Sequence, residues 1–281
     1  MMITNKQGPI GVFDSGYGGL TVLKEITTLL PQYNYLYVGD NARSPYGTRS
    51  FDTIYQYTLQ CVQWFFSQGC SLVILACNTA SAKALRTIQQ KYLPLLQDDN
   101  KRVLGVIRPT SEIIGQYSKT NHVGILATNG TVQSNSYIIE IQKFFPQVKV
   151  YQQACPMWVP LIENNEHNSA GADYFIQKEI QNLLQQQPTI DTLLLACTHY
   201  PLLLQKIKKY VPTTTTILTQ GTIVANSLQQ YLAKHHAIEQ ACSKGGQIKF
   251  YTTDDVTDFN NHATVFFGKE VKANHIDIEC K

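Results

Sequence analysis

Short apolar runs alternate with amphipathic segments along the whole chain. Continuous apolar runs of this length are typical of strands that are buried on both faces of a parallel sheet, and the amphipathic segments are typical of helices that cover it. The predicted strands are Ile10–Phe13, Tyr35–Val38, Leu72–Ala76, Val103–Ile107, Val123–Ala127, Val148–Gln152, Thr192–Ala196, Thr215–Leu218, Ile248–Thr252 and Thr264–Phe267. The predicted helices are Leu20–Leu30, Ser50–Ser67, Asn78–Tyr92, Val132–Phe145, Ala172–Gln186 and Ile223–Lys234. This alternation predicts an α/β fold with parallel sheets.

The pattern also repeats once within the chain. Residues 10–16 read IGVFDSG and residues 123–129 read VGILATN, and the strands that follow keep the same offset. Further on, VILACNTAS at 73–81 is matched by LLLACTHYP at 193–201. Three blocks in the same order predict two pseudo-symmetric α/β halves, because the spacing is far too long for a solenoid repeat.

Composition narrows the class of function. The 281 residues carry a net charge of +3 and are 15% charged, against about 25% in a typical domain. Without a Lys/Arg stripe, the chain is not expected to bind nucleic acid. Its apolar runs are far shorter than the ~18 residues of a membrane span. We therefore expect no nucleic-acid or membrane partner.

Cysteine usage points to a reducing compartment. The seven cysteines form no CxxC pair, and Met1–Gly8 lacks the apolar core of a secretory signal. Unpaired thiols in a chain without an export signal are typical of the cytosol. We expect a cytoplasmic enzyme or binding protein.

Cys77 and Cys197 occupy matching places in the two halves. Each follows a hydrophobic strand and precedes residues that start a helix. Ligands of parallel α/β sheets bind at the carboxyl ends of strands, and a helix N-terminus favours a thiolate. A single cysteine at such a place is most simply a small buried hydrophobe. Two at equivalent positions favour a functional interpretation.

Two thiols that face each other across the interface of the halves suit inversion at a carbon atom. One base removes a proton from one face of the carbon, and an acid on the other face returns one. The repeat gives each thiol a different neighbour, because Asp14 aligns with Ala127 and His199 aligns with Thr79. Taken alone, Asp14 is equally well a turn or cap residue, and His199 a loop histidine.

Small polar groups around these residues suit an amino-acid substrate. The turn at Asp14–Gly19 lacks the GxGxxG spacing and the lysine of a phosphate loop, so its glycines better suit close approach of a carboxylate. Ser15 is echoed by Thr128, and Thr131 begins the next predicted helix. Pro45–Gly47 is a loop with one tyrosine hydroxyl, which in isolation would be a plain turn.

Together these residues resemble the glutamate racemase family, within the wider aspartate/glutamate racemase superfamily. Any one motif is modest, whereas the ordered set is specific and spans nearly the whole chain. Its members are Phe13–Gly16 with Gly18–Gly19, Asp40–Arg43, Pro45–Gly47, Ala76–Ala80, Gly124–Thr128 with Gly130–Val132, Cys155–Pro156, Val159–Glu163, Ala196–Pro201 and Thr252–Asp255. The Cys-Thr-His-Tyr form and the length resemble glutamate racemases more than the shorter aspartate racemases. Thr219–Gly221 departs from the acidic or serine-bearing turn common in the family, which bears on domain packing or regulatory contacts and not on the chemistry.

The resemblance implies cofactor-independent interconversion of L- and D-glutamate, which supplies D-glutamate for peptidoglycan synthesis. It implies that Cys77 acts on the α-proton of D-glutamate and Cys197 on that of L-glutamate. Asp14 and His199 would be their respective acid–base partners. The positions that match substrate-binding residues are Ser15, Tyr46, Gly47, Asn78, Thr79, Thr128, Thr131 and Thr198, with Glu163 as an acidic residue near the site.

The family fold implied is two flavodoxin-like domains with parallel sheets and the active site at their interface. In this chain, the first domain would comprise residues 1–103 plus 216–281, and the second residues 104–215. A homodimer is possible by the same resemblance. A racemase of aspartate or another amino acid stays open, as does a non-catalytic amino-acid-binding homologue. We expect no metal, because no Cys/His pairs occur at metal-ligand spacing.

Overall fold

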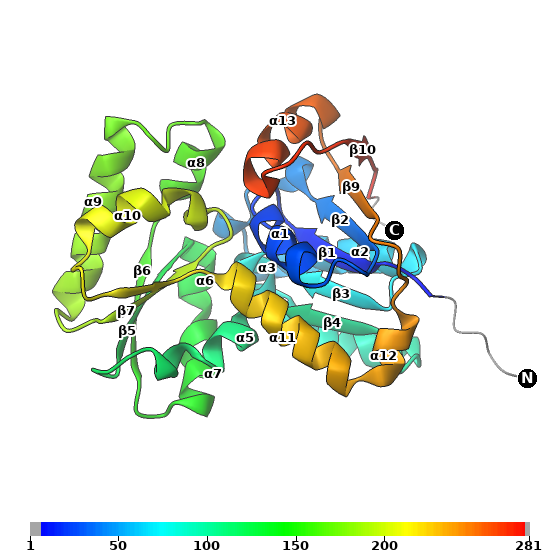
Figure 1. Ribbon diagram of the computed structural model, residues 1–281, viewed down its shortest axis with the longest axis horizontal. Helices are drawn as coiled ribbons and strands as arrows, with labels where there is room; N and C mark the ends of the chain where they lie inside the picture. Colours follow the sequence, from blue (N-terminus) through cyan, green and yellow to red (C-terminus); the bar gives the residue numbers. More distant parts are fainter. Residues whose placement is uncertain (1–6, 279–281) are drawn as a thin grey trace, which may run out of the picture.

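The computed structural model describes residues 7–278, so most of the N-terminal stretch and Cys280 lie outside the described residues. Two parallel sheets form the centres of two halves (Figure 1). The larger sheet has the order β10-β9-β2-β1-β3-β4, and the smaller has the order β6-β5-β7-β8. The strands are β1 Ile10–Asp14, β2 Tyr35–Gly39, β3 Leu72–Leu75, β4 Arg102–Gly105, β5 His122–Ala127, β6 Lys149–Ala154, β7 Thr192–Ala196, β8 Thr216–Leu218, β9 Ile248–Thr252 and β10 Ala273–His275.

Helices surround both sheets. The α-helices are α1 Leu20–Leu29, α2 Phe51–Ser67, α3 Asn78–Lys83, α4 Leu85–Thr87, α5 Ile107–Ser111, α6 Asn129–Ser134, α7 Ser136–Phe144, α8 Trp158–Glu163, α9 Ala170–Gln186, α10 Leu204–Tyr210, α11 Gln220–Lys234, α12 His236–Ala241 and α13 Val256–Phe267. Short 3-10 turns lie at Asn41–Arg43, Tyr46–Thr48, Leu93–Leu96, Ile114–Gln116 and Tyr200–Leu203, and a π-helical turn at Ile88–Tyr92. Within residues 7–278, none of these helices has the length and apolar character needed to cross a bilayer.

The two halves share one topology. The order β2-β1-β3-β4 of the larger sheet is repeated as β6-β5-β7-β8 in the smaller one. This confirms the two α/β halves that the sequence repeat predicts. Strands β9 and β10 extend the larger sheet beyond β2, so its half combines N-terminal with C-terminal segments (blue, cyan, orange and red in Figure 1). The residue boundaries of the two domains stay a prediction; β8 itself pairs with β7 in the smaller sheet.

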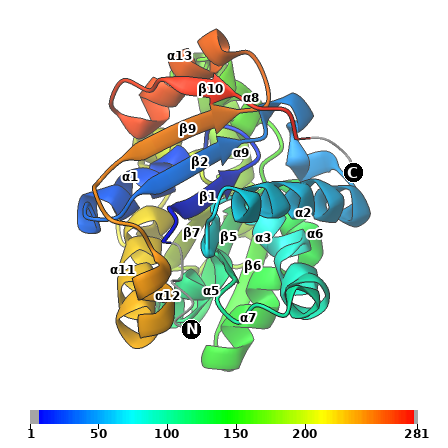
Figure 2. The same ribbon diagram turned by 90° about the vertical axis from the view of Figure 1, so that its right-hand side faces the viewer.

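Both faces of the larger sheet are covered, which explains its continuous apolar runs. Val12 of β1 packs in the hydrophobic cluster that includes residues of α1 and α11. Its neighbour Phe13 points to the other face and packs in the cluster that includes residues of α2. Figure 2 shows the corresponding arrangement, with α1 and α11 on one side of the sheet and α2 and α3 on the other.

The predicted strand Thr264–Phe267 is wrong. These residues form the last turn of α13. Asp255 caps the start of this helix, where its side chain accepts the backbone N–H of Asp258 at 2.7 Å. The helix ends at Gly268, whose φ of 77° is the left-handed conformation typical of a helix C-terminus. A β-branched and aromatic run resembled a strand, but tertiary packing of the apolar helix face decides the local structure.

Two predicted helices are interrupted. The segment 78–92 is divided into α3, α4 and a π-helical turn. The segment 132–145 breaks at Asn135, which adopts a φ of 54° between α6 and α7. The first break matters for the site, because α3 is a separate short element that starts directly after Cys77.

Candidate active site

The two topologically equivalent positions after β3 and β7 each carry a buried thiol. Cys77 caps the N-terminus of α3, and its sulfur accepts the backbone N–H of Ala80 at 3.5 Å. Cys197 follows β7 directly. Each residue is only 6% exposed. Both thiols therefore lie at the carboxyl ends of equivalent strands, where sites of parallel α/β sheets form.

The turn after β1 lies tightly against the segment after β7. Thr198 Oγ1 donates to Asp14 Oδ2 at 3.4 Å, and Thr21 Oγ1 donates to the backbone oxygen of Thr198 at 2.9 Å. A Cβ atom on Gly18 would lie 2.2 Å from Thr198 Oγ1 and 2.4 Å from His199 Nδ1. Only glycine fits at residue 18, and the two halves meet here in direct contact.

On the Cys77 side, burial dominates the electrostatics. Ser15 Oγ lies 3.4 Å from the sulfur, and Asp14 Oδ1 accepts the backbone N–H of Gly16 at 2.9 Å. Burial raises the pKa of Asp14, while the charge of His199 opposes the rise. Burial also raises the pKa of Cys77 to about 12, and the Asp14 charge adds to it. The lowered thiol pKa predicted from the helix N-terminus is therefore wrong for Cys77, because desolvation outweighs the helix end.

On the Cys197 side, a histidine joins the thiol to a carboxylate. His199 Nδ1 lies 3.9 Å from the Cys197 sulfur, and His199 Nε2 lies 2.9 Å from Glu163 Oε1. Burial opposes the charged imidazolium, but the contacts with Cys197 and Glu163 outweigh it and raise the pKa of His199 to about 10. The ring of Phe266 in α13 packs edge-on against His199, with centroids 5.1 Å apart. The imidazolium therefore persists in a largely dry setting.

Helix α13 also supports Glu163, which no sequence signal indicated. His262 Nε2 donates to the backbone oxygen of Glu163 at 2.9 Å. The His262 ring stacks on Tyr17 at 4.8 Å, and the Tyr17 hydroxyl donates to Asp258 at 2.7 Å. These contacts join residues far apart in sequence, so local patterning could not reveal them.

Three predicted hydroxyls come together between the halves. Thr79 Oγ1 of α3 lies 3.0 Å from Thr128 Oγ1, which in turn donates to Thr131 Oγ1 at 3.2 Å. Thr128 also caps α6 by accepting the backbone N–H of Thr131 at 3.3 Å. A Cβ atom on Gly47 would lie 3.2 Å from Thr128 Cβ, so the 46–48 turn packs on the same group.

Two other predicted side chains are already engaged by the protein. The Tyr46 hydroxyl is buried and donates to Asp40 Oδ2. Asp40 also accepts two hydrogen bonds from Arg43 Nε, at 2.7 and 2.9 Å. The Asn78 amide is bonded to Tyr137 and Gln220. For Tyr46 and Asn78, the backbone is thus the part best placed to meet a ligand.

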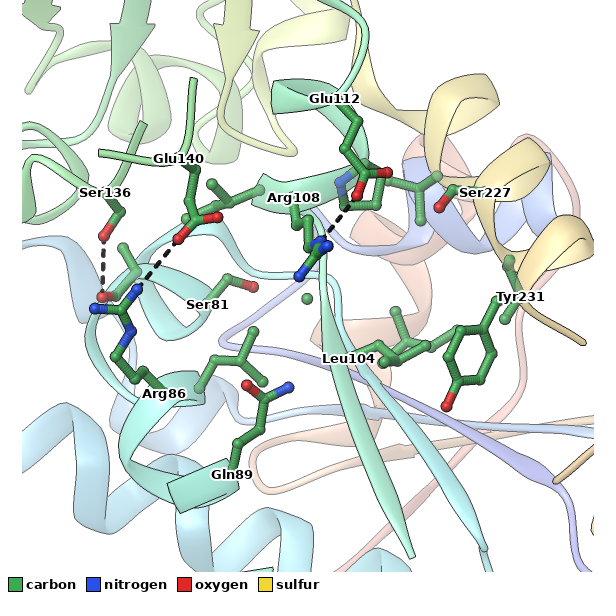
Figure 3. Close-up of a pocket in the computed structure, with 18 of the residues that line it drawn as sticks. Ser81, Arg86, Gln89, Leu104, Arg108, Glu112, Ser136, Glu140, Ser227 and Tyr231 are labelled. Atoms are coloured by element: carbon green, nitrogen blue, oxygen red, sulfur yellow. Dashed lines mark hydrogen bonds and ion pairs between the residues drawn. The ribbon is translucent and has the colours of Figure 1, made fainter. Parts of the chain in front are cut away.

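A cavity of about 730 Å³ lies apart from the thiols, among α3, α4, α5, α7 and α11 (Figure 3). Ion pairs at its wall join Arg86 with Glu140 at 3.2 Å and Arg108 with Glu112 at 2.8 Å. None of the predicted site residues lines it. This cavity is therefore not the candidate active site, because the thiols and their acid–base neighbours meet elsewhere. Within residues 7–278, no three His, Cys, Asp or Glu side chains are grouped to hold a metal ion.

Comparison with known proteins identifies the family of this chain. Residues 10–245 match the family model described as Asp/Glu/Hydantoin racemase. A glutamate racemase of Levilactobacillus brevis is 36% identical over 272 residues, which cover 96% of this chain and 95% of that protein. The crystal structure of a Bacillus anthracis glutamate racemase isoform superposes with a TM-score of 0.87 and 32% identity, over 97% of this chain and 98% of that one. A Francisella tularensis glutamate racemase, solved with D-glutamate, has a TM-score of 0.85 and 29% identity over the same shares. The chain belongs to the glutamate racemase family, as its ordered motifs predicted.

Proposed function

We propose that the protein racemises glutamate without a cofactor, by proton transfer between Cys77 and Cys197 on opposite faces of the α-carbon. The observation that carries this proposal is the pair of buried thiols at equivalent strand ends of two topologically matched halves. The charge of Cys197 acts on Cys77 and adds to the rise in its pKa, which supports one shared site. Two groups in one site with different neighbours suit a reaction that has an acid and a base in each direction.

The proposed resting state is asymmetric. Cys77 holds its proton, because its pKa is raised to about 12 by burial and then by Asp14. Cys197 is the proposed base, with the His199 imidazolium 3.9 Å from its sulfur. In this state the enzyme is ready to accept L-glutamate.

The proton transfers then follow from that state. The Cys197 thiolate takes the α-proton of L-glutamate and becomes a thiol, which leaves an electron pair on the α-carbon. That pair takes the proton of Cys77 from the opposite face, which gives D-glutamate and a Cys77 thiolate. Ser15 Oγ lies 3.4 Å from this second sulfur and can donate to its thiolate. Asp14 is the proposed acid–base partner, and burial raises its pKa, which favours uptake of a proton as the thiolate forms. The reverse reaction uses the same groups in the opposite order.

The α-proton of an amino acid is weakly acidic, so the site must stabilise developing negative charge with fixed donors. The proposed donors to the substrate carboxylates are the three linked hydroxyls of Thr79, Thr128 and Thr131. The backbone of Tyr46–Gly47 is a further proposed donor. The backbone at Asn78 and the Thr198 hydroxyl would complete the set, one from each half; the Thr198 hydroxyl would turn from Asp14 to the substrate.

The proposed product has a biological use. D-Glutamate is a component of peptidoglycan, so we infer that this reaction supplies it to cell-wall synthesis in the cytoplasm. The homodimer that the resemblance implies stays a prediction, which sedimentation velocity of the purified protein would test.

Proton NMR of L-glutamate in D₂O, combined with circular dichroism of the amino acid, tests the proposed activity. We expect the α-proton signal and the ellipticity to decay together with no cofactor added. Exchange of the α-proton of L-aspartate but not of L-glutamate would support the same proton transfer with aspartate as the substrate. Silence with both amino acids, from folded protein with free thiols, would contradict the proposal and favour a non-catalytic binding protein.

A further inference from the structure

Three buried side chains form a closed ring of hydrogen bonds beside Cys77. Tyr137 Oη donates to Asn78 Oδ1 at 2.6 Å, and Asn78 Nδ2 donates to Gln220 Oε1 at 2.7 Å. Gln220 Nε2 closes the ring by donating to Tyr137 Oη at 2.8 Å. Tyr137 is fully buried, and Asn78 and Gln220 are each 3% exposed. An unmade hydrogen bond in such a place is costly, so the ring is energetically significant.

The direction of every bond in this ring follows from one backbone group. Gln220 Nε2 also lies 3.1 Å from the backbone oxygen of Val106, which can only accept. The Gln220 amide nitrogen must therefore face Val106, and its oxygen must face Asn78. Asn78 can then only donate to Gln220, which turns its own oxygen toward the Tyr137 hydroxyl. A second contact, from Gln220 Nε2 to Thr110 Oγ1 at 3.2 Å, reinforces the same orientation.

The tyrosine keeps its donor role over the working pH range. Burial raises the pKa of Tyr137 above its usual value, the Gln220 hydrogen bond opposes this rise, and the charge of Cys197 adds to it. A hydroxyl that stays protonated always has a proton to give to Asn78. The ring therefore has one stable arrangement.

The ring joins elements that belong to different parts of the fold. Asn78 starts α3 directly after Cys77, Tyr137 lies on α7, and Gln220 is the first residue of α11. Val106 and Thr110 contribute the start of α5. The same four helices line the cavity of Figure 3, where Ser81, Ser136 and Ser227 mark α3, α7 and α11. The cavity separates these helices over part of their length, so the hydrogen bonds of the ring are a specific point at which they contact one another.

We propose that Gln220 is a positioning residue for glutamate racemisation, which holds the Asn78 amide and the first turn of α3 in one orientation beside Cys77. This inference rests on the proposed function, since it assigns a role within that site. Gln220 touches no reacting atom and acts through Asn78, 142 positions away in sequence. The departure of Thr219–Gly221 from the family pattern therefore bears on the site itself, not only on domain packing.

The test compares kinetics of Gln220→Leu with those of the wild-type protein. Leucine fills similar space but cannot hold Asn78, so we expect KM for both glutamate enantiomers to rise about tenfold, with little change in kcat. In an Asn78→Ala background, Gln220→Leu should raise KM no further, because the side chain through which it acts is gone. A merely structural role would raise KM or lower stability equally in both backgrounds and would not show this dependence.

Two further variants keep the test decisive. Tyr137→Phe removes a single hydroxyl of the ring without changing its shape, and we expect it to raise KM about threefold even if Gln220→Leu does not fold. Gln89→Leu is the matched control, because Gln89 donates one hydrogen bond to the backbone oxygen of Val103 at 2.8 Å and lines the same cavity. Its KM should match the wild type.

Distinct outcomes separate this inference from the proposed function. A wild-type protein that exchanges no glutamate α-proton would overturn the proposed function and this inference with it. An active wild type whose KM is unchanged by Tyr137→Phe and by folded Gln220→Leu would overturn the positioning role alone. An equal rise of KM in the Asn78→Ala background would do the same.

Discussion

The Cys77 side and the Cys197 side share one scaffold and differ in the charges beside the sulfur. Each thiol follows the strand, β3 or β7, that holds the same place in the four-strand order shared by the two sheets. Ser15 contacts the Cys77 sulfur, and the charge of Asp14 acts on it. His199 contacts the Cys197 sulfur and is itself bonded to Glu163. The repeated part of the fold thus sets where the thiols lie, and unrepeated residues set what each can do.

In the proposed mechanism, this difference makes Cys77 the acid and Cys197 the base when L-glutamate is the substrate. Two identical thiols in one site would titrate as a coupled pair with no preference between them. Here burial and the carboxylate raise the pKa of Cys77 to about 12, while the pKa of His199 beside Cys197 is raised to about 10. A negative group on one side and a positive group on the other favour opposite protonation states, which is what a two-base racemisation requires.

The strongest test of the comparison removes each thiol in turn. We expect Cys77→Ser and Cys197→Ser each to slow racemisation about a thousandfold or more, because a serine hydroxyl is a poor acid and base at neutral pH. Circular dichroism of glutamate measures the rate. Cys242→Ser is the control, since that buried thiol donates to the backbone oxygen of Ile238 and is not among the predicted site residues. Near-wild-type turnover by either of the first two variants would contradict the two-thiol mechanism.

Changing the helper residues should affect the two half-reactions differently. We expect Asp14→Asn to slow by about a hundredfold the step in which Cys77 acts, and His199→Asn to slow the Cys197 step to a similar extent. Steady-state rates must still obey the overall equilibrium. Primary isotope effects with α-deuterated L- and D-glutamate therefore provide the measurement. Equal isotope effects in both directions for both variants would contradict the assignment of Asp14 to Cys77 and of His199 to Cys197.

One added methyl group at Gly18 should disturb the contact between the turn after β1 and the segment after β7. A Cβ atom at residue 18 would overlap Thr198 and His199, so we expect Gly18→Ala to lower kcat on the order of tenfold through displaced groups. Gly171→Ala is the matched control, because its Cβ atom would lie 3.5 Å from Ser169 Oγ, which is an ordinary van der Waals contact. Unchanged kcat in Gly18→Ala would show that the halves need not touch there.

The smallest expected effect concerns pH. Against burial, Cys197 and Glu163 raise the pKa of His199 to about 10, so the imidazolium persists until pH rises through that value. Glu163→Gln removes one of the causes that raise this pKa, and His199 then loses its proton at lower pH. We expect kcat/KM for L-glutamate, relative to wild type, to fall roughly threefold more at pH 9 than at pH 7.

Glu112→Gln is the control for this pH effect, because Glu112 forms an exposed ion pair with Arg108. Comparing proteins on one substrate removes the titration of glutamate itself from the result. If kcat/KM for L-glutamate falls at the same alkaline pH in Glu163→Gln as in the wild type, Glu163 does not support His199.

The sequence predicted most of the fold because both signals it contains are local or repeated. Buried parallel strands are short apolar runs, and the repeat placed Cys77 and Cys197 at equivalent strand ends. The wrong strand at Thr264–Phe267 arose because a β-branched and aromatic run also suits a helix whose apolar face packs inward. Such a segment is decided by its tertiary partners, which the sequence alone does not identify.

The site was less accessible to sequence reasoning. Its candidate residues were found through motifs and the repeat, but their interactions were not. The raised pKa of Cys77 depends on burial, which overrides the local helix N-terminus. Tyr137 and Gln220 bind Asn78 across 59 and 142 positions, and no local pattern predicts contacts of that range.

Isotope labelling of product and residual substrate most directly tests the central claim that two different thiols act on opposite faces. L-Glutamate is converted in D₂O by the wild-type protein, and at low conversion both enantiomers are separated and analysed by mass spectrometry. The account predicts deuterium at the α-carbon of the D-glutamate formed, delivered by Cys77, and almost none in the remaining L-glutamate, whose proton is held by Cys197. Equal early labelling of both enantiomers would contradict it, because that is the signature of one base serving both faces.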